Sequence, residues 1–272
     1  MTVALFAPCY VDQLYPGVAV ASLRLLEALG VDVRAPAGAV CCGQPMANAG
    51  FSGQSARAEA AYREAFAGFE TVVTPSGSCA AHLRAHVGGA GGRTLELCEF
   101  LRDRVGLDRV RALGARWEAR VGVHVGCHAL RGLGLATPTE AGPLAPEASG
   151  ETAARGTGTL RASAVHDLLG TVRGLEVVAL ARPDECCGFG GTFAVAEPAV
   201  SVAMGRARLA DHRAAGAEAV VSTDVSCAMH MEGLARREGA SPEAANRRAS
   251  GASLRFVHVA EALMMGVAGA GA

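Results

Sequence analysis

The chain has 272 residues, half of them hydrophobic, and a formal net charge of −1. This length fits one large domain or two of ordinary size, and the charge gives no argument for binding nucleic acid or an anionic membrane surface. All 25 basic residues are arginine, which excludes a Schiff-base lysine and a phosphate-loop lysine.

Strand and helix patterns alternate from the N-terminus. The apolar run Val3–Cys9 predicts a strand. Apolar residues at helical spacing from Val18 to Leu29, followed by Gly30, predict a helix that ends there. The other segments expected in this half are a strand at Val31–Arg34, a helix at about Gln54–Phe69, a strand at Glu70–Pro75, a helix from Ser76 to about His86 and an apolar segment at Thr94–Phe100.

The second half repeats this order. Residues 132–160 are rich in Gly, Pro, Ala and Thr without an apolar period, so we expect a mobile surface insertion there. The segments that correspond to those of the first half are Val121–Cys127, Ser163–Val172, Leu175–Leu180, Pro198–Ala214, Ala219–Thr223, Cys227–Glu238 and Phe256–Leu263.

This alternation predicts an α/β fold with two duplicated βαβ-type lobes and parallel sheets. The first lobe is expected as a domain at residues 1–118 and the second at 119–272, with the boundary near an arginine-rich helix that ends at Arg120.

Eight of the nine cysteines form two copies of one pattern: a lone cysteine, a Cys-Cys-Gly triplet and a final cysteine. All eight come after predicted strands, and α/β proteins bind ligands beyond the carboxyl ends of their parallel strands. We therefore expect each lobe to gather four thiols at one edge of its sheet. The two sets are Cys9, Cys41, Cys42 and Cys79, and Cys127, Cys186, Cys187 and Cys227.

The adjacent cysteines indicate which metal these thiols would bind. Thiolates in fours are typical of zinc, copper or iron–sulfur sites. A single zinc ion usually takes its thiolates from C-x₂₋₄-C turns, whereas neighbouring side chains diverge and can reach different irons of one cluster. Four thiolates suffice for a [4Fe–4S] cluster. The pattern therefore favours an iron–sulfur cluster, and protein prepared in air could carry zinc instead.

The cysteine segments resemble those of the cysteine-rich CCG-domain proteins, and among them the lactate-utilisation protein A family. The similarity covers nearly the whole chain, apart from residues 132–160 and the C-terminal tail. The stretches that carry it are APCYVDQLYPGVAVASLRLLEALG, CCGQPMANAGF, VVTPSGSCA, the GCH at Gly126–His128, and CCGFGGTFAV.

The resemblance implies an iron–sulfur subunit of a complex that oxidises L-lactate to pyruvate. The same domain occurs in the iron–sulfur subunit of glycolate oxidase, and also in anaerobic glycerol-3-phosphate dehydrogenase and heterodisulfide reductase. The partners implied are therefore the other subunits of a lactate or glycolate oxidation complex.

Two positions depart from the wider family pattern, which ends in C-x-x-C. The first cysteine of that motif is replaced by Ser76 in one lobe and by Asp224 in the other. Either residue could supply an oxygen ligand, although capping of the following helix is favoured. His82 and His230 each stand three residues after the last cysteine of a set. They could replace a thiolate, although histidine is also common on the surface of early helical turns.

Other noticeable residues are expected to have structural or supporting roles. Cys98 lies outside the pattern in an apolar run, so we expect it to fill the core. His128 could donate a hydrogen bond to a sulfur, and His124 is expected to pack in or beside its strand. Gly188–Gly191 lacks the G-x-G-x-x-G order, which disfavours a dinucleotide site. No residue is assigned a catalytic role.

The leading hypothesis is an electron-transfer subunit of an L-lactate or other 2-hydroxy-acid oxidising complex. Two alternatives stay open: a zinc-stabilised interaction module, and a thiol–disulfide redox protein of the heterodisulfide reductase type, because disulfides between adjacent cysteines are strained and labile. The N-terminus has no signal-peptide pattern, and no apolar run approaches the roughly 18 residues of a membrane span. We expect a cytoplasmic protein, with peripheral attachment at the inner face of the membrane left open.

Overall fold

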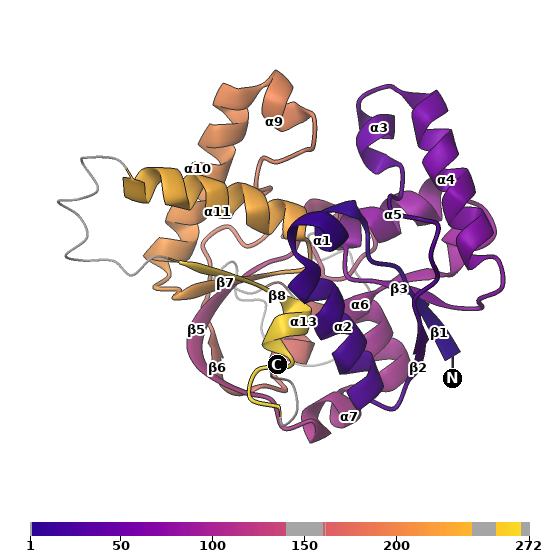
Figure 1. Ribbon diagram of the computed structural model, residues 1–272. Coiled ribbons are helices and arrows are strands. Elements are labelled where there is room, and N and C mark those ends of the chain that lie inside the picture. Colours follow the sequence, from indigo (N-terminus) through magenta and orange to yellow (C-terminus); the bar gives the residue numbers. More distant parts are fainter. Residues whose placement is uncertain (1, 140–159, 161, 241–253, 268–272) are drawn as a thin grey trace.

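Two four-stranded parallel sheets organise the chain, one in each half (Figure 1). The computed structural model describes residues 2–139, 160, 162–240 and 254–267. The first sheet has the order β2-β1-β3-β4 and the second β6-β5-β7-β8, so the two lobes share one topology. This confirms the predicted α/β fold with two duplicated lobes. The strands are β1 (Thr2–Leu5), β2 (Asp32–Arg34), β3 (Val72–Thr74), β4 (Thr94–Glu96), β5 (Arg116–His124), β6 (Arg173–Val177), β7 (Ala219–Ser222) and β8 (Arg255–His258).

Helices connect consecutive strands in both lobes. Those of the first lobe are α1 (Cys9–Leu14), α2 (Pro16–Ala28), α3 (Gln44–Asn48), α4 (Ser52–Phe66), α5 (Gly77–His86), η1 (Gly91–Arg93), α6 (Leu97–Phe100), η2 (Leu101–Val105) and α7 (Leu107–Ala112). Those of the second are η3 (His128–Gly132), α8 (Ala164–Leu169), α9 (Phe193–Ala196), α10 (Pro198–Ala214), α11 (Val225–Ala240) and α13 (Val259–Ala262). Figure 1 shows α3–α4 and α9–α10 as two arms at the top of the view, one from each lobe.

Local sequence signals account for the ends of two long helices, α2 and α10. Proline occupies the first turn of α2 and α10, where its missing N–H is not needed. Gly30 adopts a φ of 70° directly after the end of α2 and lets the chain turn into β2. The predicted segments at Pro198–Ala214 and Ser76–His86 correspond closely to α10 and α5.

Two segments differ from the prediction. The expected arginine-rich helix ending at Arg120 is wrong, because Arg116–His124 forms strand β5. Exposed Arg116, Glu118 and Arg120 alternate there with half-buried residues, which is the period of a strand and not of a helix. Thr94–Phe100 is divided between β4 and α6. The boundary predicted between residues 118 and 119 lies within β5 and stays a prediction.

The two lobes share a central hydrophobic core. Along β1 and the residue after it, Val3 and Leu5 point into this core, whereas Ala4 and Phe6 point into a separate cluster on the other face of the sheet. Leu25 of α2 and Leu168 of α8 belong to the same central core, although they come from different lobes. The lobes are therefore joined by packing as well as by the chain.

Part of the predicted insertion belongs to this core. Leu135, Ala136 and Leu160 are buried in the central cluster. The backbone of Leu135 also accepts a hydrogen bond from Ala164 N at 2.9 Å. The expectation of a mobile surface segment is therefore wrong for these residues, and 140–159 lie outside the described residues. Among the described helices, none has the length and apolar character needed to cross a bilayer.

Candidate metal centre

The cysteines lie at the carboxyl ends of the strands, as the sequence predicts. Cys9 follows β1 and opens α1, and Cys79 follows β3 in the first turn of α5. The strands β1 and β3 are neighbours in the sheet, although their connections leave toward opposite sides of the strand order. This is the switch point at which doubly wound folds bind ligands. Cys127 and Cys227 occupy the same places after β5 and β7.

Each lobe brings its four predicted cysteines together as free thiols. In the first lobe the thiol of Cys9 donates to Cys41 Sγ at 3.8 Å. The Cys41 sulfur also accepts a hydrogen bond from Cys42, which in turn contacts Cys79. The second lobe repeats this chain of sulfur contacts in the order Cys127, Cys186, Cys187 and Cys227.

The triplet glycines place backbone donors against the sulfurs. Gly43 N donates to Cys41 Sγ at 3.4 Å, and Gly188 N donates to Cys186 Sγ at 3.3 Å. Both glycines have positive φ, 98° and 86° respectively. A Cβ at Gly188 would also lie 2.6 Å from the carbonyl oxygen of Ser201. A side chain at this position would therefore be strained and would clash, so the turn that follows the two cysteines requires glycine.

One thiol in each set has a pKa far below its ordinary value. Hydrogen bonds from Cys42 and Cys9 lower the pKa of Cys41 to about 2, and bonds from Cys127 and Cys187 do the same for Cys186. The partner thiols that donate these bonds, Cys9 and Cys127, have raised pKa values for the same reason and because of burial. Without a cation, each set therefore stabilises one thiolate beside protonated neighbours. Four thiolates at once need a soft cation, so the donor set fits an iron–sulfur cluster or zinc.

Both cysteine sets face one cavity between the lobes. Its volume is about 100 Å³, and its lining includes cysteines of both sets together with Tyr10 and Phe189. The rings of Tyr10 and Phe189 meet edge to face with centroids 5.8 Å apart. Gln44 Nε2 and His128 Nε2, from opposite lobes, lie 3.1 Å apart. The sequence did not indicate this shared cavity, because the motifs say nothing about how the lobes are packed.

Ser76 and Asp224, the two departures from C-x-x-C, meet at the bottom of this site. Ser76 Oγ donates to Asp224 Oδ1 at 2.7 Å, and the backbone N–H of Ser78 donates to Asp224 Oδ2 at 2.9 Å. Ser76 also caps α5 by accepting from Cys79 N at 3.3 Å, which confirms its predicted capping role. Burial raises the pKa of Asp224, and these donors oppose that effect. The pair therefore joins the lobes directly beneath the cysteines.

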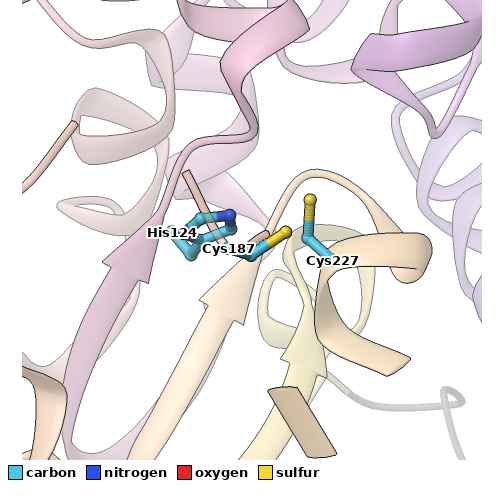
Figure 2. A group of neighbouring side chains, drawn as sticks. All are labelled: His124, Cys187 and Cys227. Carbon is cyan, nitrogen blue, oxygen red and sulfur yellow. The ribbon is translucent and has the colours of Figure 1, made fainter. Parts of the chain in front are cut away.

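The histidines near the cysteines have different partners in the two lobes. His82 Nε2 lies 3.1 Å from the carboxylate of Glu59, whereas His230 Nε2 lies 3.4 Å from Ser201 Oγ. His124 is buried at the end of β5, and one of its ring nitrogens lies within 4.8 Å of the sulfurs of Cys187 and Cys227 (Figure 2). The sequence predicted that His124 packs in or beside its strand but did not place it against these sulfurs. Side chains alternate between the two faces of a strand. Val121 and Val123 face the central core, so the sequence could have indicated that His124 points to the other face.

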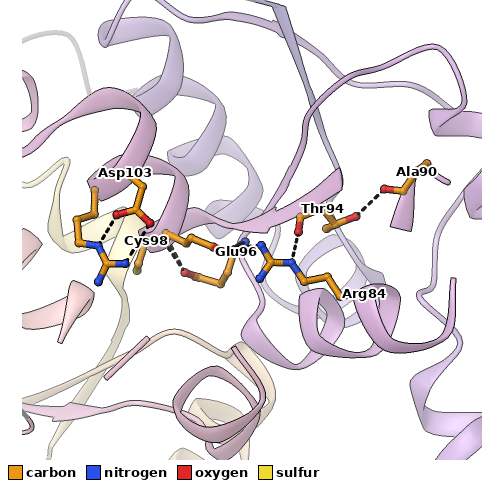
Figure 3. A network of polar contacts seen from close by, with 8 residues as sticks. Arg84, Ala90, Thr94, Glu96, Cys98 and Asp103 are labelled. Carbon is orange, nitrogen blue, oxygen red and sulfur yellow. Dashed lines mark hydrogen bonds and ion pairs between the residues drawn. The ribbon is translucent and has the colours of Figure 1, made fainter. Parts of the chain in front are cut away.

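Cys98 is separate from the two sets. It is fully buried in the central core within α6, as predicted. Its backbone N–H donates to Glu96 Oε2 at 2.6 Å as part of a capping box, and Arg84 binds the neighbouring Thr94 carbonyl (Figure 3). Burial raises the pKa of the Cys98 thiol well above its ordinary value. This cysteine therefore serves packing and not metal binding.

The chain matches a known domain family in both halves. The family model of the CCG cysteine-rich domain matches residues 3–84 and 153–232. The first match contains all four cysteines of the first set, and the second contains three of the other set but not Cys127.

Curated relatives are similar over most of the chain. "Lactate utilization protein A" of an Exiguobacterium species is 32% identical, with 97% of this chain and 98% of the relative covered. The protein of the same name from Macrococcus caseolyticus is 34% identical, with 90% and 93% covered. "Lactate utilization protein A 1" of Bacillus mycoides is 33% identical, with 88% and 91% covered.

Proposed function

The chain belongs to the family of proteins with the CCG cysteine-rich domain, and we propose that it is an iron–sulfur electron-transfer subunit of a complex that oxidises L-lactate. The observation that carries the proposal is the pair of four-cysteine sets, seven of whose eight members line one cavity. The names of the relatives, which refer to lactate utilisation, support the choice of L-lactate among the 2-hydroxy acids.

In each lobe, the cysteines would bind the cluster and backbone N–H groups would donate hydrogen bonds to their sulfurs. The ligands proposed are Cys9, Cys41, Cys42 and Cys79 in the first lobe and Cys127, Cys186, Cys187 and Cys227 in the second. Gly43 N and Gly188 N already donate to sulfur, and such bonds offset the negative charge of clustered thiolates. When bound, an iron–sulfur cluster supplies one-electron carrier chemistry. [4Fe–4S] is the form proposed, because each lobe provides four thiolates.

The chain is proposed to depend on partner subunits for lactate oxidation. Removal of two electrons from a C–H bond requires a hydride acceptor such as a flavin or a nicotinamide. The cavity has a volume of only about 100 Å³ and is lined by seven cysteines, which suits an inorganic centre better than such a coenzyme. We therefore propose that a partner dehydrogenase donates electrons and that a quinone-linked acceptor removes them.

Anaerobic reconstitution tests the proposal. The full chain should bind iron and acid-labile sulfide, with a broad visible absorption, in amounts that fit two clusters. Cys42→Ser and Cys187→Ser should each remove about half of the iron, and the double variant should remove nearly all of it. Cys98→Ser, outside both sets, is the matched control and should keep the full amount.

The alternatives predict different results in the same experiment. Colourless protein that takes up zinc in place of iron and sulfide would support a zinc-stabilised interaction module. Lactate turnover by the isolated, reconstituted chain would contradict the proposed need for partner subunits. Turnover that appears only with added dehydrogenase subunits, and is lost in the double cysteine variant, is the result expected.

A further inference from the structure

The two lobes differ in what lies beneath the cysteines. In the first lobe, three aromatic rings pack together on the outer face of the sheet. The ring of Phe6 meets those of Tyr62 and Phe66 edge to face, with centroids 5.0 Å and 5.5 Å apart. In the second lobe, the corresponding positions hold three nitrogen-bearing side chains that are also buried: His124, Arg208 and His212.

The correspondence follows from the shared framework of the lobes. Phe6 and His124 each stand three residues before the first cysteine of their set. A serine packs against the triplet glycine in both lobes, Ser55 in α4 and Ser201 in α10. The residue seven positions after that serine is Tyr62 in the first lobe and Arg208 in the second. The residue eleven positions after it is Phe66 in the first lobe and His212 in the second. The same space is therefore filled by aromatic rings in one lobe and by a buried cation with two imidazoles in the other.

Arg208 is fixed by the backbone around it. It is fully buried, and its Nη1 donates to Asp211 Oδ2 at 2.8 Å and to the carbonyl oxygen of Arg182 at 2.7 Å. Its Nη2 donates to the carbonyl oxygens of Val123 and Pro183, each at 3.4 Å. Burial of a charged pair costs free energy that an apolar trio does not. The first lobe shows that this space accepts such a trio, so stability alone does not account for Arg208.

The remaining donor of Arg208, its Nε–H, determines which tautomer His124 adopts. Arg208 Nε donates to His124 Nδ1 at 3.3 Å. Because an arginine N–H can only donate, Nδ1 must offer its lone pair, and the proton of the neutral ring lies on Nε2. Nε2 is buried and has no hydrogen-bond partner among the described residues. A histidine that binds a metal through Nε2 would need the opposite tautomer, so this ring is arranged as a hydrogen-bond donor and not as a ligand.

Two cysteine sulfurs of the second set lie near the His124 ring. Figure 2 shows the imidazole next to Cys187, with Cys227 on the adjacent helix α11, and a ring nitrogen lies within 4.8 Å of both sulfurs. Within the described part of the first lobe, Phe6 offers no such donor at the corresponding position. The first lobe instead places the side chain of Glu59 beside its triplet glycine, with its carboxylate bound to His82, at a position that Gly205 occupies in the second lobe.

From this arrangement we propose that Arg208 positions His124 to donate its Nε2–H to a sulfur of the second-lobe centre, which gives that centre the higher reduction potential of the two. The inference rests on the proposed function, because it assumes an iron–sulfur centre in each lobe. Reduction adds one electron to a centre, and a hydrogen bond to sulfur stabilises the added negative charge. Electrons are therefore expected to collect on the second lobe.

The test is a redox titration of the reconstituted full chain, with dithionite as the electron donor and EPR as the readout. A Cys42→Ser background assigns the signal of the second-lobe centre. His124→Phe, which copies Phe6, should lower the reduction potential of this centre. The ratio of oxidised to reduced centre should rise at least tenfold, which corresponds to about 59 mV for one electron. His124→Gln, which keeps an N–H donor, should recover part of the shift. Phe6→Leu is the matched control and should leave the second-lobe potential unchanged.

Each outcome separates the two proposals. A chain that binds no iron and sulfide would overturn the proposed function, and this inference with it. Two centres with equal potentials, or an unchanged potential in His124→Phe, would overturn the inference alone. Loss of second-lobe iron from both His124 variants would show a ligand and would also overturn it. If His124→Phe does not fold, the triple variant His124→Phe/Arg208→Tyr/His212→Phe copies the packing of the first lobe and should show the same shift.

Discussion

At the scale of single residues, burial shifts the pKa of some acidic groups away from its ordinary value, and Glu96 is an example. Glu96 is fully buried at the start of α6, where its Oε2 accepts from the backbone N–H groups of Cys98 and Glu99. Its other oxygen has no partner among the described residues. Burial raises its pKa from the ordinary 4.5 to about 8, against the opposing effect of the two backbone donors. The side chain is therefore expected to be a neutral carboxylic acid at neutral pH.

This state makes stability depend on pH in a defined direction. Because the pKa of Glu96 is higher in the folded than in the unfolded state, its contribution is fully present below about pH 4.5 and is lost as the pH rises toward about 8. Glu96→Gln keeps a hydrogen-bonding group of the same shape without the ionisation. Its free energy of unfolding relative to the wild type should rise by on the order of a few kcal/mol between pH 5 and pH 8.

Chemical denaturation of both proteins at a series of pH values measures this difference. The comparison cancels the buried histidines, which both proteins share. A difference that is flat across the range would mean that Glu96 is already ionised in the fold. A difference that falls with pH would give the opposite sign to the one worked out above.

At the scale of helices and strands, close packing between the lobes depends on small residues. Gly77 begins α5 and faces Ala129 of η3 in the other lobe. A Cβ at Gly77 would lie 2.5 Å from the Cβ of Ala129, well inside van der Waals contact. The contact therefore sets how near α5, which carries Cys79, can approach the second lobe.

Gly77→Ala should destabilise the protein by about 1–3 kcal/mol, since overpacking forces the two helices apart. Gly53→Ala in α4 is the matched control: nothing lies within 4 Å of a Cβ at that position, so helix propensity should leave stability unchanged or raise it by up to about 1 kcal/mol. The double variant Gly77→Ala/Ala129→Gly should recover most of the loss. Equal effects of Gly77→Ala and Gly53→Ala on the denaturation midpoint would argue against the packing explanation.

The sequence predicted the strands and long helices because their signals are local. Buried parallel strands such as Val72–Thr74 are short runs of β-branched residues, and α10 has proline at its start. The cysteine pattern likewise predicted which thiols come together. Short helices such as α3 and α9 give too few residues for a period. Arg208 was missed for a different reason: in the sequence it is one charged residue on an amphipathic helix, and only the packing of α10 against β5 buries it beside His124.

At the scale of the whole molecule, duplication has produced two lobes that are alike in topology and unlike in their polar interiors. The same strand order and the same cysteine positions recur. Asp224 has Ser76 as its counterpart and binds it across the interface. Two equivalent positions of the lobes therefore hold different residues that bind each other. The interface therefore combines symmetry of the backbone with asymmetry of its charges.

The shared core predicts that the two lobes fold together and not separately. Leu25 and Leu101 come from the first half of the chain and Leu168 and Leu263 from the second, yet all four are fully buried in one cluster. Fragments 1–114 and 115–272, divided before β5 begins at Arg116, would each expose their side of this cluster to water, at about 25 cal/mol for each Å² of apolar surface. The full chain should therefore unfold in a single transition with denaturant, and neither fragment should show a sharp transition alone. Mixing the fragments should restore one, and a cooperative transition in an isolated fragment would show instead that the central core is dispensable.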